Sequence, residues 1–338
     1  MARILSTRNS GSKSSVARAF WVTGAGRGEI RSEPLREPGT DDVVVRTRYS
    51  AISRGSESLV WAGRIPVSEH ERMRAPFQEG SFPAPVKYGY INVGTVESGA
   101  PELLGRDVFC LYPHQTRYVV PRSAVFRIPD DVPPARAVLA ANLETALNGI
   151  WDAELRAGQP VSVIGAGAVG ALVAWLARRG FGADVELIDT NPARAEIATA
   201  LGVAFATPER ARADATTLVH ASGSAQGLRT ALELAAFEGT IIELSWYGDR
   251  EVSLPLGAAF HSRRLTIRSS QVGAVAKPQR ATKTHRQRMA EALGWLTDPA
   301  LDVLITGESA LDELPVVMQT LADARNTATI CHRIRYDT

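Results

Sequence analysis

The chain has 338 residues, which at about 150 residues per domain predicts two domains. Hydrophobic residues make up 45% of it and charged residues 22%, which excludes a disordered chain, a collagen-like repeat and a small disulfide-stapled scaffold. Its 38 basic and 36 acidic side chains leave a net charge of +2, so the charge gives no indication of a nucleic-acid partner.

Cysteine content and apolar run lengths narrow the class further. The two cysteines, Cys110 and Cys331, are too few for a disulfide framework and are typical of a reducing compartment. They form no C-x-x-C pair, so a four-ligand structural zinc site is not expected. No apolar run reaches the roughly 18 residues of a membrane helix, and residues 1–18 lack the apolar centre of a signal peptide. We therefore expect a cytoplasmic protein without a membrane partner, in which residues 1–18 are a flexible lead-in.

The first part of the chain has the pattern of an all-β unit. Short apolar alternations broken by Gly and Pro predict strands over 43–49, 92–97, 107–112 and 116–120. Residues 64–87 contain four prolines and are predicted to form a long loop.

Near residue 136 the pattern changes to alternating strands and helices. Apolar runs predict strands over 161–164, 185–188, 217–219, 240–244 and 265–267. Helical periodicity predicts helices over 135–150, 168–179, 192–201 and 226–237. This alternation is typical of a parallel, doubly wound α/β sheet with helices on both faces.

The tail, from residue 277, changes pattern again. Helices are predicted over 279–296 and 314–324, and a strand over 329–336. We expect this tail to rejoin the first domain.

The strongest motif is the run Gly165-Ala166-Gly167-Ala168-Val169-Gly170, between a predicted strand and an amphipathic helix. In this context G-x-G-x-x-G is the dinucleotide fingerprint. Its first glycine allows a tight turn, the second lets a pyrophosphate approach the backbone, and the third lets helix and strand pack closely. The helix start at Ala168 and Val169 then offers free N–H groups to the phosphates.

An acidic residue follows at the expected distance. Asp189 closes the second strand, 19 residues after Gly170, where a carboxylate accepts hydrogen bonds from the adenosine ribose and repels a 2′-phosphate. This favours NAD(H) over NADP(H). Thr190 belongs to the same predicted site. Arg194 keeps NADP(H) as an alternative cofactor, since a nearby arginine can hold a 2′-phosphate.

The arrangement resembles the medium-chain dehydrogenase/reductase superfamily over roughly residues 20–336. Residues 49–57 are similar to its segment ending in C-G-T-D, 87–94 to its G-H-E-x-x-G, and 139–146 to the segment ending in a cofactor-contacting T-A, here with Thr145. The S-R-G-S-E version resembles a branch that includes bacteriochlorophyllide hydroxyethyl dehydrogenases. The resemblance implies a GroES-like β-barrel catalytic domain over 19–135 and 272–338, a Rossmann domain over 136–271, and a homodimer.

The departures from that superfamily concern its catalytic zinc. The alignment places Arg54, Tyr90 and Ala141 where zinc ligands stand in the zinc enzymes, with Ile91 in place of an acidic neighbour. A guanidinium and a methyl group cannot ligate zinc, and a phenol would be an unusual ligand. We therefore predict no metal.

Without zinc, positioned donors must stabilise the charge that develops on a carbonyl oxygen. Ser56 is the first candidate for a proton relay and Tyr90 the second, as an oxyanion donor. Further candidates share a polar or charged side chain near the lost zinc site; they are Arg54, Glu57, Lys87, His114 and Glu144. Each of these residues could instead have a purely structural role. Arg54 and Glu57 could form a salt bridge, and Lys87 could be an ordinary surface lysine. Glu144 could cap its helix, and the other side chains could simply pack in a loop or in the core.

The ends of later strands supply the remaining cofactor candidates. Ligands of open α/β sheets bind at the carboxyl edge of the strands. The residues predicted there are Ser222, Ser245, Trp246 and Gln271.

The sequence thus predicts a zinc-independent, NAD(H)-dependent oxidoreductase that interconverts an alcohol and a ketone or aldehyde. Phe77 and Phe82 in the 64–87 loop suggest a small-molecule substrate that is bulky and partly apolar. An NADPH-dependent reductase of activated C=C bonds and a non-catalytic dinucleotide-binding sensor or partner subunit remain open. Residues 252–256 and 301–305 are predicted as edges at which a homodimer could form.

Overall fold

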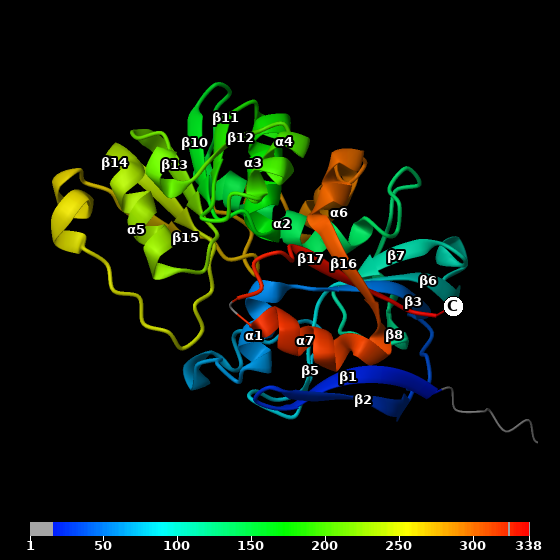
Figure 1. Cartoon of the computed structure of the whole chain (residues 1–338). Coiled ribbons are helices and arrows are strands. Elements are labelled where there is room, and N and C mark those ends of the chain that lie inside the picture. The colour runs from blue at the N-terminus through cyan, green and yellow to red at the C-terminus, as the bar shows by residue number, and fades with distance from the viewer. Residues whose placement is uncertain (1–15, 324, 338) are drawn as a thin grey trace, which may run out of the picture.

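The computed structural model describes residues 16–323 and 325–337, and in it the chain forms two units that lie against each other (Figure 1). The N-terminal part and the C-terminal tail build one unit, and the middle of the chain builds the other. Residues 1–15 of the predicted lead-in lie outside the described residues, and the first strand already begins at Val16.

The first unit contains two sheets. One has the order β2-β1-β5-β4, and the other has the order β16-β17-β3-β6-β7-β9, with β8 also paired to β3. The strands are β1 (Val16–Gly24), β2 (Arg27–Pro34), β3 (Asp42–Ile52), β4 (Glu79–Gly80), β5 (Val86–Lys87), β6 (Asn92–Ser98), β7 (Asp107–Cys110), β8 (Arg117–Pro121), β9 (Val125–Arg127), β16 (Ile305–Ala310) and β17 (Cys331–Arg335).

Strand β3 is the centre of the larger sheet. Its valines Val43 and Val45 are fully buried, because this β-branched segment packs into the barrel core. On its other side β3 pairs antiparallel with β17, where His332 lies opposite Ile52. The tail is therefore part of the first unit's larger sheet.

The second unit is a six-stranded sheet with the order β12-β11-β10-β13-β14-β15, in which all pairs are parallel. This is the strand order 3-2-1-4-5-6 of the Rossmann fold. The strands are β10 (Pro160–Ile164), β11 (Asp184–Ile188), β12 (Ala204–Ala206), β13 (Ala215–His220), β14 (Ala235–Glu243) and β15 (Thr266–Ser269). The helices that cover it include α3 (Ala168–Phe181), α4 (Arg194–Ala200) and α5 (Ala225–Leu234). The predicted α/β fold class is confirmed.

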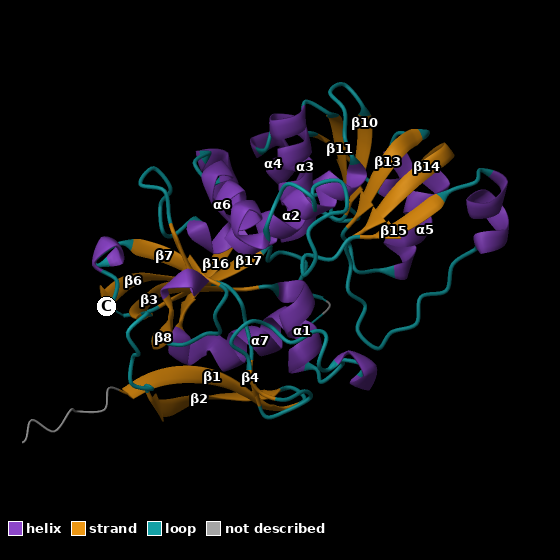
Figure 2. Ribbon diagram, turned by 180° about the vertical axis from the view of Figure 1, so that it is seen from behind, coloured by secondary structure: helices purple, strands orange, loops and turns teal. Residues whose placement is uncertain are grey.

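Helices also join the two units. α2 (Ala140–Ala153) packs against both α3 and α6 (His285–Trp295), so it lies between the parallel sheet and the sheet of β16 and β17 (Figure 2). α1 (Arg54–Trp61) packs against α7 (Leu314–Ala322) beside the smaller sheet. Leu172, Val173 and Leu176 of α3 are fully buried, as their helical spacing predicted, and Val169 is half-buried.

Three predicted segments differ from the structure. The helix predicted over 226–237 ends at Leu234, because the guanidinium of Arg263 donates to the carbonyls of Glu233 and Ala235 and so satisfies the helix end. Residues 301–304 are a 3₁₀ turn in the core instead of a sheet edge, and residues 252–256 form no strand. The parallel sheet instead ends at β15.

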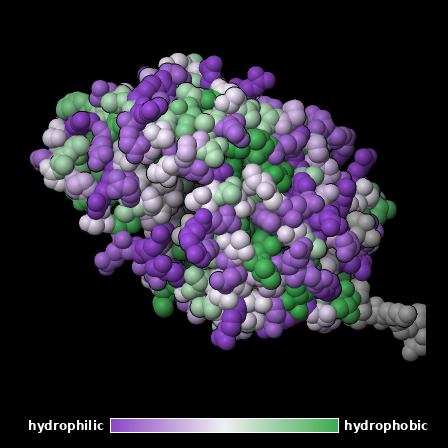
Figure 3. Space-filling view, in the orientation of Figure 1, coloured by the Kyte–Doolittle hydropathy of each residue, from purple (hydrophilic) through white to green (hydrophobic). Residues whose placement is uncertain are grey.

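The surface mixes hydrophilic and apolar residues. On the face seen in Figure 3, hydrophilic residues surround scattered apolar patches. Among the residues that the structure describes, no helix combines the length and the apolar character needed to cross a bilayer.

Candidate active site

The glycine loop between β10 and α3 is shaped by two close contacts. Gly165 has φ +104°, and a Cβ there would lie 2.7 Å from the backbone of Ser222. A Cβ at Gly170 would lie 1.8 Å from the Gly165 carbonyl oxygen. A Cβ at Gly167 would meet nothing within 4 Å. Packing therefore requires the outer glycines, whereas the middle one faces open space.

That open space fits a dinucleotide pyrophosphate. Gly167 is exposed and caps α3, whose first residues Ala168 and Val169 are half-buried. No side chain caps this helix start, so its N–H groups remain available to an anion.

Asp189 lies beside this loop. Its carboxylate accepts the N–H of Ala166 at 2.7 Å and the N–H of Asn191 at 2.8 Å. These bonds hold the half-buried carboxylate at the carboxyl end of β11, next to the exposed Thr190. The position matches that of an adenosine ribose acceptor.

Arg194 uses its guanidinium in contacts with the backbone before β17. Its guanidinium donates to the carbonyl oxygens of Thr327 at 2.6 Å and of Ala328 at 3.2 Å. Burial lowers the pKa of this guanidinium, while the nearby carboxylate of Asp189 opposes the shift. Its donors are thus used to hold the chain just before β17.

The ends of β13 and β14 bring two predicted cofactor residues together. The N–H of Gly223, next to Ser222, donates to Ser245 Oγ at 3.0 Å. Because Ser222 also packs against Gly165, both serines lie on the same sheet edge as the glycine loop.

The other two strand-end candidates lie differently. Trp246 packs against the apolar core of the first unit, so its ring helps to join the units. Gln271 is exposed, and its side-chain oxygen accepts the N–H of Gly273 at 2.7 Å.

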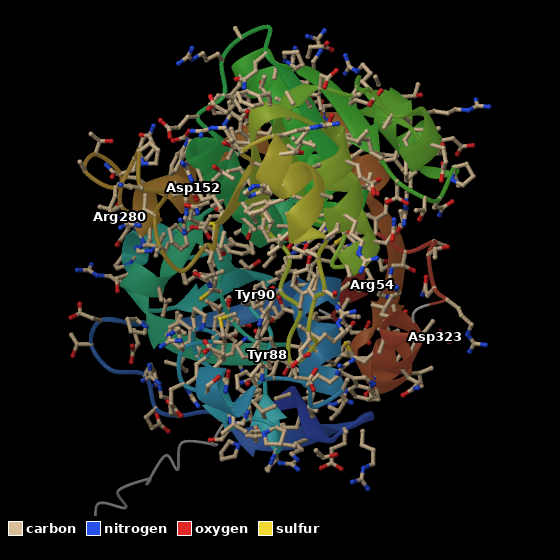
Figure 4. All side chains as sticks on the ribbon, turned by 90° about the vertical axis from the view of Figure 1, so that its left-hand side faces the viewer. Arg54, Tyr88, Tyr90, Asp152, Arg280 and Asp323 are labelled. Carbon is tan, nitrogen blue, oxygen red and sulfur yellow. The ribbon has the colours of Figure 1, made fainter. Side chains whose placement is uncertain are left out.

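A cluster of hydroxyls lies at the start of α1. The Tyr90 hydroxyl donates to Ser53 Oγ at 2.6 Å and lies 3.0 Å from Ser56 Oγ, again within hydrogen-bond distance. Tyr90 packs against both major apolar cores, and Figure 4 places it with Tyr88 in the middle of the molecule. Burial raises the pKa of Tyr90, against the effect of its two serine partners.

Glu57 and His114 form a buried pair behind this cluster. Glu57 Oε1 accepts the N–H of Ser53 at 2.8 Å, and its Oε2 lies 2.9 Å from His114 Nε2. His114 Nδ1 is 2.7 Å from Ser50 Oγ, which is 2.9 Å from the hydroxyl of Tyr336. Glu57 and His114 therefore orient the α1 loop and do not reach the cluster through their own side chains.

Arg54 makes no salt bridge to Glu57. Its guanidinium donates to the carbonyl oxygens of Leu321 at 3.1 Å and Asp323 at 3.4 Å, and Figure 4 shows Arg54 and Asp323 on the same side of the molecule. Burial lowers the pKa of Arg54, and the charge of Arg194 lowers it further. Arg54 thus ties α1 to the end of α7.

Lys87 is buried instead of lying on the surface. Only 1% of it is exposed, and its ammonium contacts carboxylates of Glu33 at 2.8 Å and Glu79 at 2.6 Å and the side-chain oxygen of Gln115 at 2.7 Å. An ammonium has three donors, so these partners satisfy it. The Lys87 ammonium therefore has no free donor for a substrate.

Glu144 is likewise paired and does not cap its helix. Its Oε1 accepts the fully buried Arg288 Nε at 3.0 Å, which ties α2 to α6. Burial raises the pKa of Glu144, against the attraction of Arg288. The neighbouring Thr145 donates its hydroxyl to the carbonyl of Ala141 at 3.0 Å. Glu144 is thus a structural residue.

The donor set does not fit a catalytic zinc. Arg54, Tyr90 and Ala141 stand at the positions where the sequence resemblance predicted zinc ligands, and the thiols are buried elsewhere, with burial raising the pKa of both Cys110 and Cys331 to about 12. Thiolates are the form that binds zinc. Over residues 16–323 and 325–337, no three His, Cys, Asp or Glu side chains gather as a metal site.

Three polar residues at the two units' functional ends were not predicted from the sequence. Ser53 is the nearest partner of Tyr90 and directly precedes Arg54, so its place beside Ser56 was the signal for it. His220 and Glu243 end the neighbouring strands β13 and β14, and a polar residue at the end of each apolar run was the signal for them.

No family model matches the sequence. A 2-desacetyl-2-hydroxyethyl bacteriochlorophyllide A dehydrogenase of Rhodobacter capsulatus is 31% identical over 47% of this chain and 52% of its own length. An L-threonine 3-dehydrogenase of Sinorhizobium medicae is 27% identical over 60% of this chain and 64% of its own. The chain thus spans about half to two thirds of these curated relatives.

Solved structures share the fold over nearly the whole chain. A zinc-binding dehydrogenase of Sinorhizobium meliloti bound to NADP has a TM-score of 0.75 at 18% identity and covers 95% of this chain and 99% of its own. An alcohol dehydrogenase of Escherichia coli CFT073 in complex with NADH has a TM-score of 0.74 at 15% identity, and the match covers 95% of this chain and 99% of its own. The chain therefore shares its two-unit fold with solved dehydrogenases, and the resemblance that the sequence indicated is confirmed to this extent: its curated relatives are dehydrogenases and a zinc-type alcohol dehydrogenase-like protein of Haemophilus influenzae.

Proposed function

We propose that the chain is a zinc-independent oxidoreductase that interconverts an alcohol and a ketone or aldehyde with NAD(H). The observation that carries the proposal is the cluster of hydroxyls formed by Tyr90, Ser53 and Ser56, in a chain whose second unit presents an open glycine loop. The relatives' printed names, which are those of dehydrogenases, support the same class of reaction.

The hydroxyl cluster would take the part that zinc plays in its relatives. Reducing a carbonyl builds negative charge on its oxygen, and hydroxyl donors stabilise that charge. Burial raises the pKa of Tyr90, so the phenol keeps its proton at neutral pH and acts as a donor. A phenol carries one proton and donates fully to one serine at a time. Ser56 therefore keeps its own proton for the substrate oxygen.

Glu57 acts on this cluster as a positioning residue. Its buried carboxylate holds the N–H of Ser53 at 2.8 Å and thus fixes the loop that carries both serines. His114, on the other carboxylate oxygen, keeps Glu57 in place.

The second unit would hold the dinucleotide. The backbone from Gly165 to Gly170 would receive the pyrophosphate, and Asp189 the adenosine ribose hydroxyls. When bound, NAD(H) supplies or accepts the hydride. Since the guanidinium of Arg194 is bonded to Thr327 and Ala328, it is not aimed at a 2′-phosphate, which supports NAD(H) over NADP(H).

A turnover screen tests the proposal. The purified chain is offered alcohols and ketones with each dinucleotide, with and without a chelator, and its zinc content is measured by mass spectrometry. We expect turnover with NAD(H) that the chelator leaves unchanged, and no stoichiometric zinc. One tightly held zinc per chain, lost together with activity, would overturn the zinc-independent mechanism.

We also propose that the chain forms a homodimer, with β15 as the pairing edge. β15 ends the parallel sheet, and Thr266, Arg268 and Ser269 are exposed. An unpaired edge can accept another strand. Sedimentation at micromolar concentration should give a dimer, and a monomer would reject this assembly.

A further inference from the structure

A second polar cluster lies at the carboxyl ends of β13 and β14. His220 and Glu243 end these strands and are register partners in the parallel pairing. His220 is fully buried, and its Nδ1 lies 2.8 Å from Glu243 Oε2. On the other side of the ring, Nε2 lies 2.6 Å from Ser222 Oγ. Hydroxyl, imidazole and carboxylate in this order form the arrangement of a nucleophile, its base and the group that orients the base.

The surroundings of Glu243 fix the tautomer of the imidazole. The N–H of Ser245 donates to Glu243 Oε1 at 2.7 Å, and the Tyr247 hydroxyl donates to Oε2 at 3.1 Å. A carboxylate only accepts, so the His220 nitrogen that faces it, Nδ1, carries the proton. Nε2 then presents its lone pair to the hydroxyl of Ser222, which is the direction that a general base requires.

Ser222 is also accessible and lies against a helix start. The residue is exposed, and a Cβ at Gly227 would lie 2.2 Å from its Oγ, which places the hydroxyl at the first turn of α5. Ser224 caps this helix by accepting the N–H of Gly227 at 2.9 Å. N–H groups of a first helical turn have no partner inside the helix and can stabilise an oxyanion.

We propose that Ser222, His220 and Glu243 form a second catalytic site, which hydrolyses small activated carboxylic esters without a dinucleotide. Ser222 Oγ bonds to the acyl carbon while its proton passes to His220 Nε2. The bond from that carbon to the alcohol oxygen breaks, and the departing oxygen takes the proton. Water then attacks the acyl-serine in the same way, which releases the carboxylic acid and restores Ser222.

The test uses a fluorophosphonate probe and p-nitrophenyl acetate on the purified chain, with no cofactor added. We expect the probe to attach to Ser222, as located by peptide mass spectrometry. Ser222→Ala should abolish labelling and lower ester hydrolysis by about 100-fold or more. The matched control is Ser262→Ala, which removes an exposed serine hydroxyl outside this cluster and should leave both readouts unchanged.

Glu243 acts through His220, so its test needs a more specific readout. Glu243→Gln introduces an amide that can donate to Nδ1, which moves the imidazole proton to Nε2 and removes the base. Glu243→Asp keeps an acceptor and should retain more hydrolysis and labelling than Glu243→Gln, while circular dichroism confirms that both variants are folded. Equal losses in the two variants would show a merely structural role.

The proposal is overturned if the probe labels another residue, if nothing is labelled, or if folded Ser222→Ala hydrolyses the ester at the wild-type rate. None of these readouts needs NAD(H) or hydride transfer. Its failure is therefore distinguishable from failure of the proposed oxidoreductase function.

Discussion

The hydroxyl oxygens of Tyr90 and Ser56 lie 3.0 Å apart, although the two residues are 34 positions apart in the sequence and belong to different elements. Ser56 is in the first turn of α1, and Tyr90 follows β5. This pair links the start of α1 to the segment that follows β5. Two hydroxyls at hydrogen-bond distance can hold a substrate oxygen and pass a proton to it.

Removing either hydroxyl should slow turnover. We expect Ser56→Ala to lower kcat by about 10²–10³, the usual cost of deleting one oxyanion donor, and Tyr90→Phe to lower kcat as well, because the phenol holds the serine oxygens in place. NADH affinity, measured by fluorescence titration, should stay nearly unchanged. Ser58→Ala is the matched control on the same helix, because the Ser58 hydroxyl is buried without a hydrogen-bond partner among the described residues. Near-wild-type kcat in both variants would move the chemistry away from this pair.

Asp189 should set the preference for the dinucleotide. Asp189→Ala removes a charged acceptor and is expected to weaken NADH binding by about 1.5–3 kcal/mol. It should also reduce the difference between the affinities for NADH and NADPH. Asp184→Ala, at the opposite end of β11, removes only an exposed salt bridge to Arg212 and should not alter binding. Calorimetric titration of both dinucleotides distinguishes these outcomes. A wild type that binds NADPH more tightly than NADH would contradict the role of Asp189.

The sequence predicted the dinucleotide fold well because that information is local. Gly170 is required by a contact with Gly165 in the same loop, Gly165 by its φ of +104°, and the spacing of Leu172 and Leu176 follows from helical geometry. That the sheet is parallel then follows from the alternation of strand and helix.

The states of the charged residues were less predictable, because they depend on partners far along the chain. Lys87 resembles a surface lysine in sequence, yet Glu33 lies 54 positions away and Gln115 lies 28 positions away. Glu144 finds Arg288 across 144 positions. Tertiary packing decides such pairs, and no local pattern marks them.

The Glu144–Arg288 pair offers a test of stability. Only 1% of the Arg288 side chain and 7% of the Glu144 side chain are exposed. Glu144→Ala leaves a buried guanidinium without its carboxylate and should lower the free energy of unfolding by about 3–5 kcal/mol. The double variant Glu144→Leu/Arg288→Met should recover much of the loss. For comparison, Glu69→Ala breaks the exposed pair with Arg72 and should cost about 0–1 kcal/mol. Urea denaturation measures all three, and equal losses for the two single variants would contradict the importance of the buried pair.

The two thiols should be inert in the folded chain. Burial raises the pKa of Cys110 and Cys331 to about 12, whereas a free thiol has a pKa of about 8.5. At pH ~8.5 an unfolded thiol is half ionised, but fewer than about one in a thousand of these buried thiols carry charge. Since the folded pKa lies above the unfolded one, burial of the neutral thiols stabilises the fold fully below pH ~8.5, and this contribution falls as the pH rises toward about 12.

Alkylation measures this protection directly. At pH ~8.5, iodoacetamide should leave Cys110 and Cys331 unmodified in the native chain and modify both in urea, as counted by intact mass. A thiol that takes part in metal binding or catalysis would behave differently, because its thiolate would be stabilised and accessible. Stoichiometric alkylation of either cysteine before the chain unfolds would therefore show that its thiol is not held in the core, and would reopen the question of a cysteine ligand.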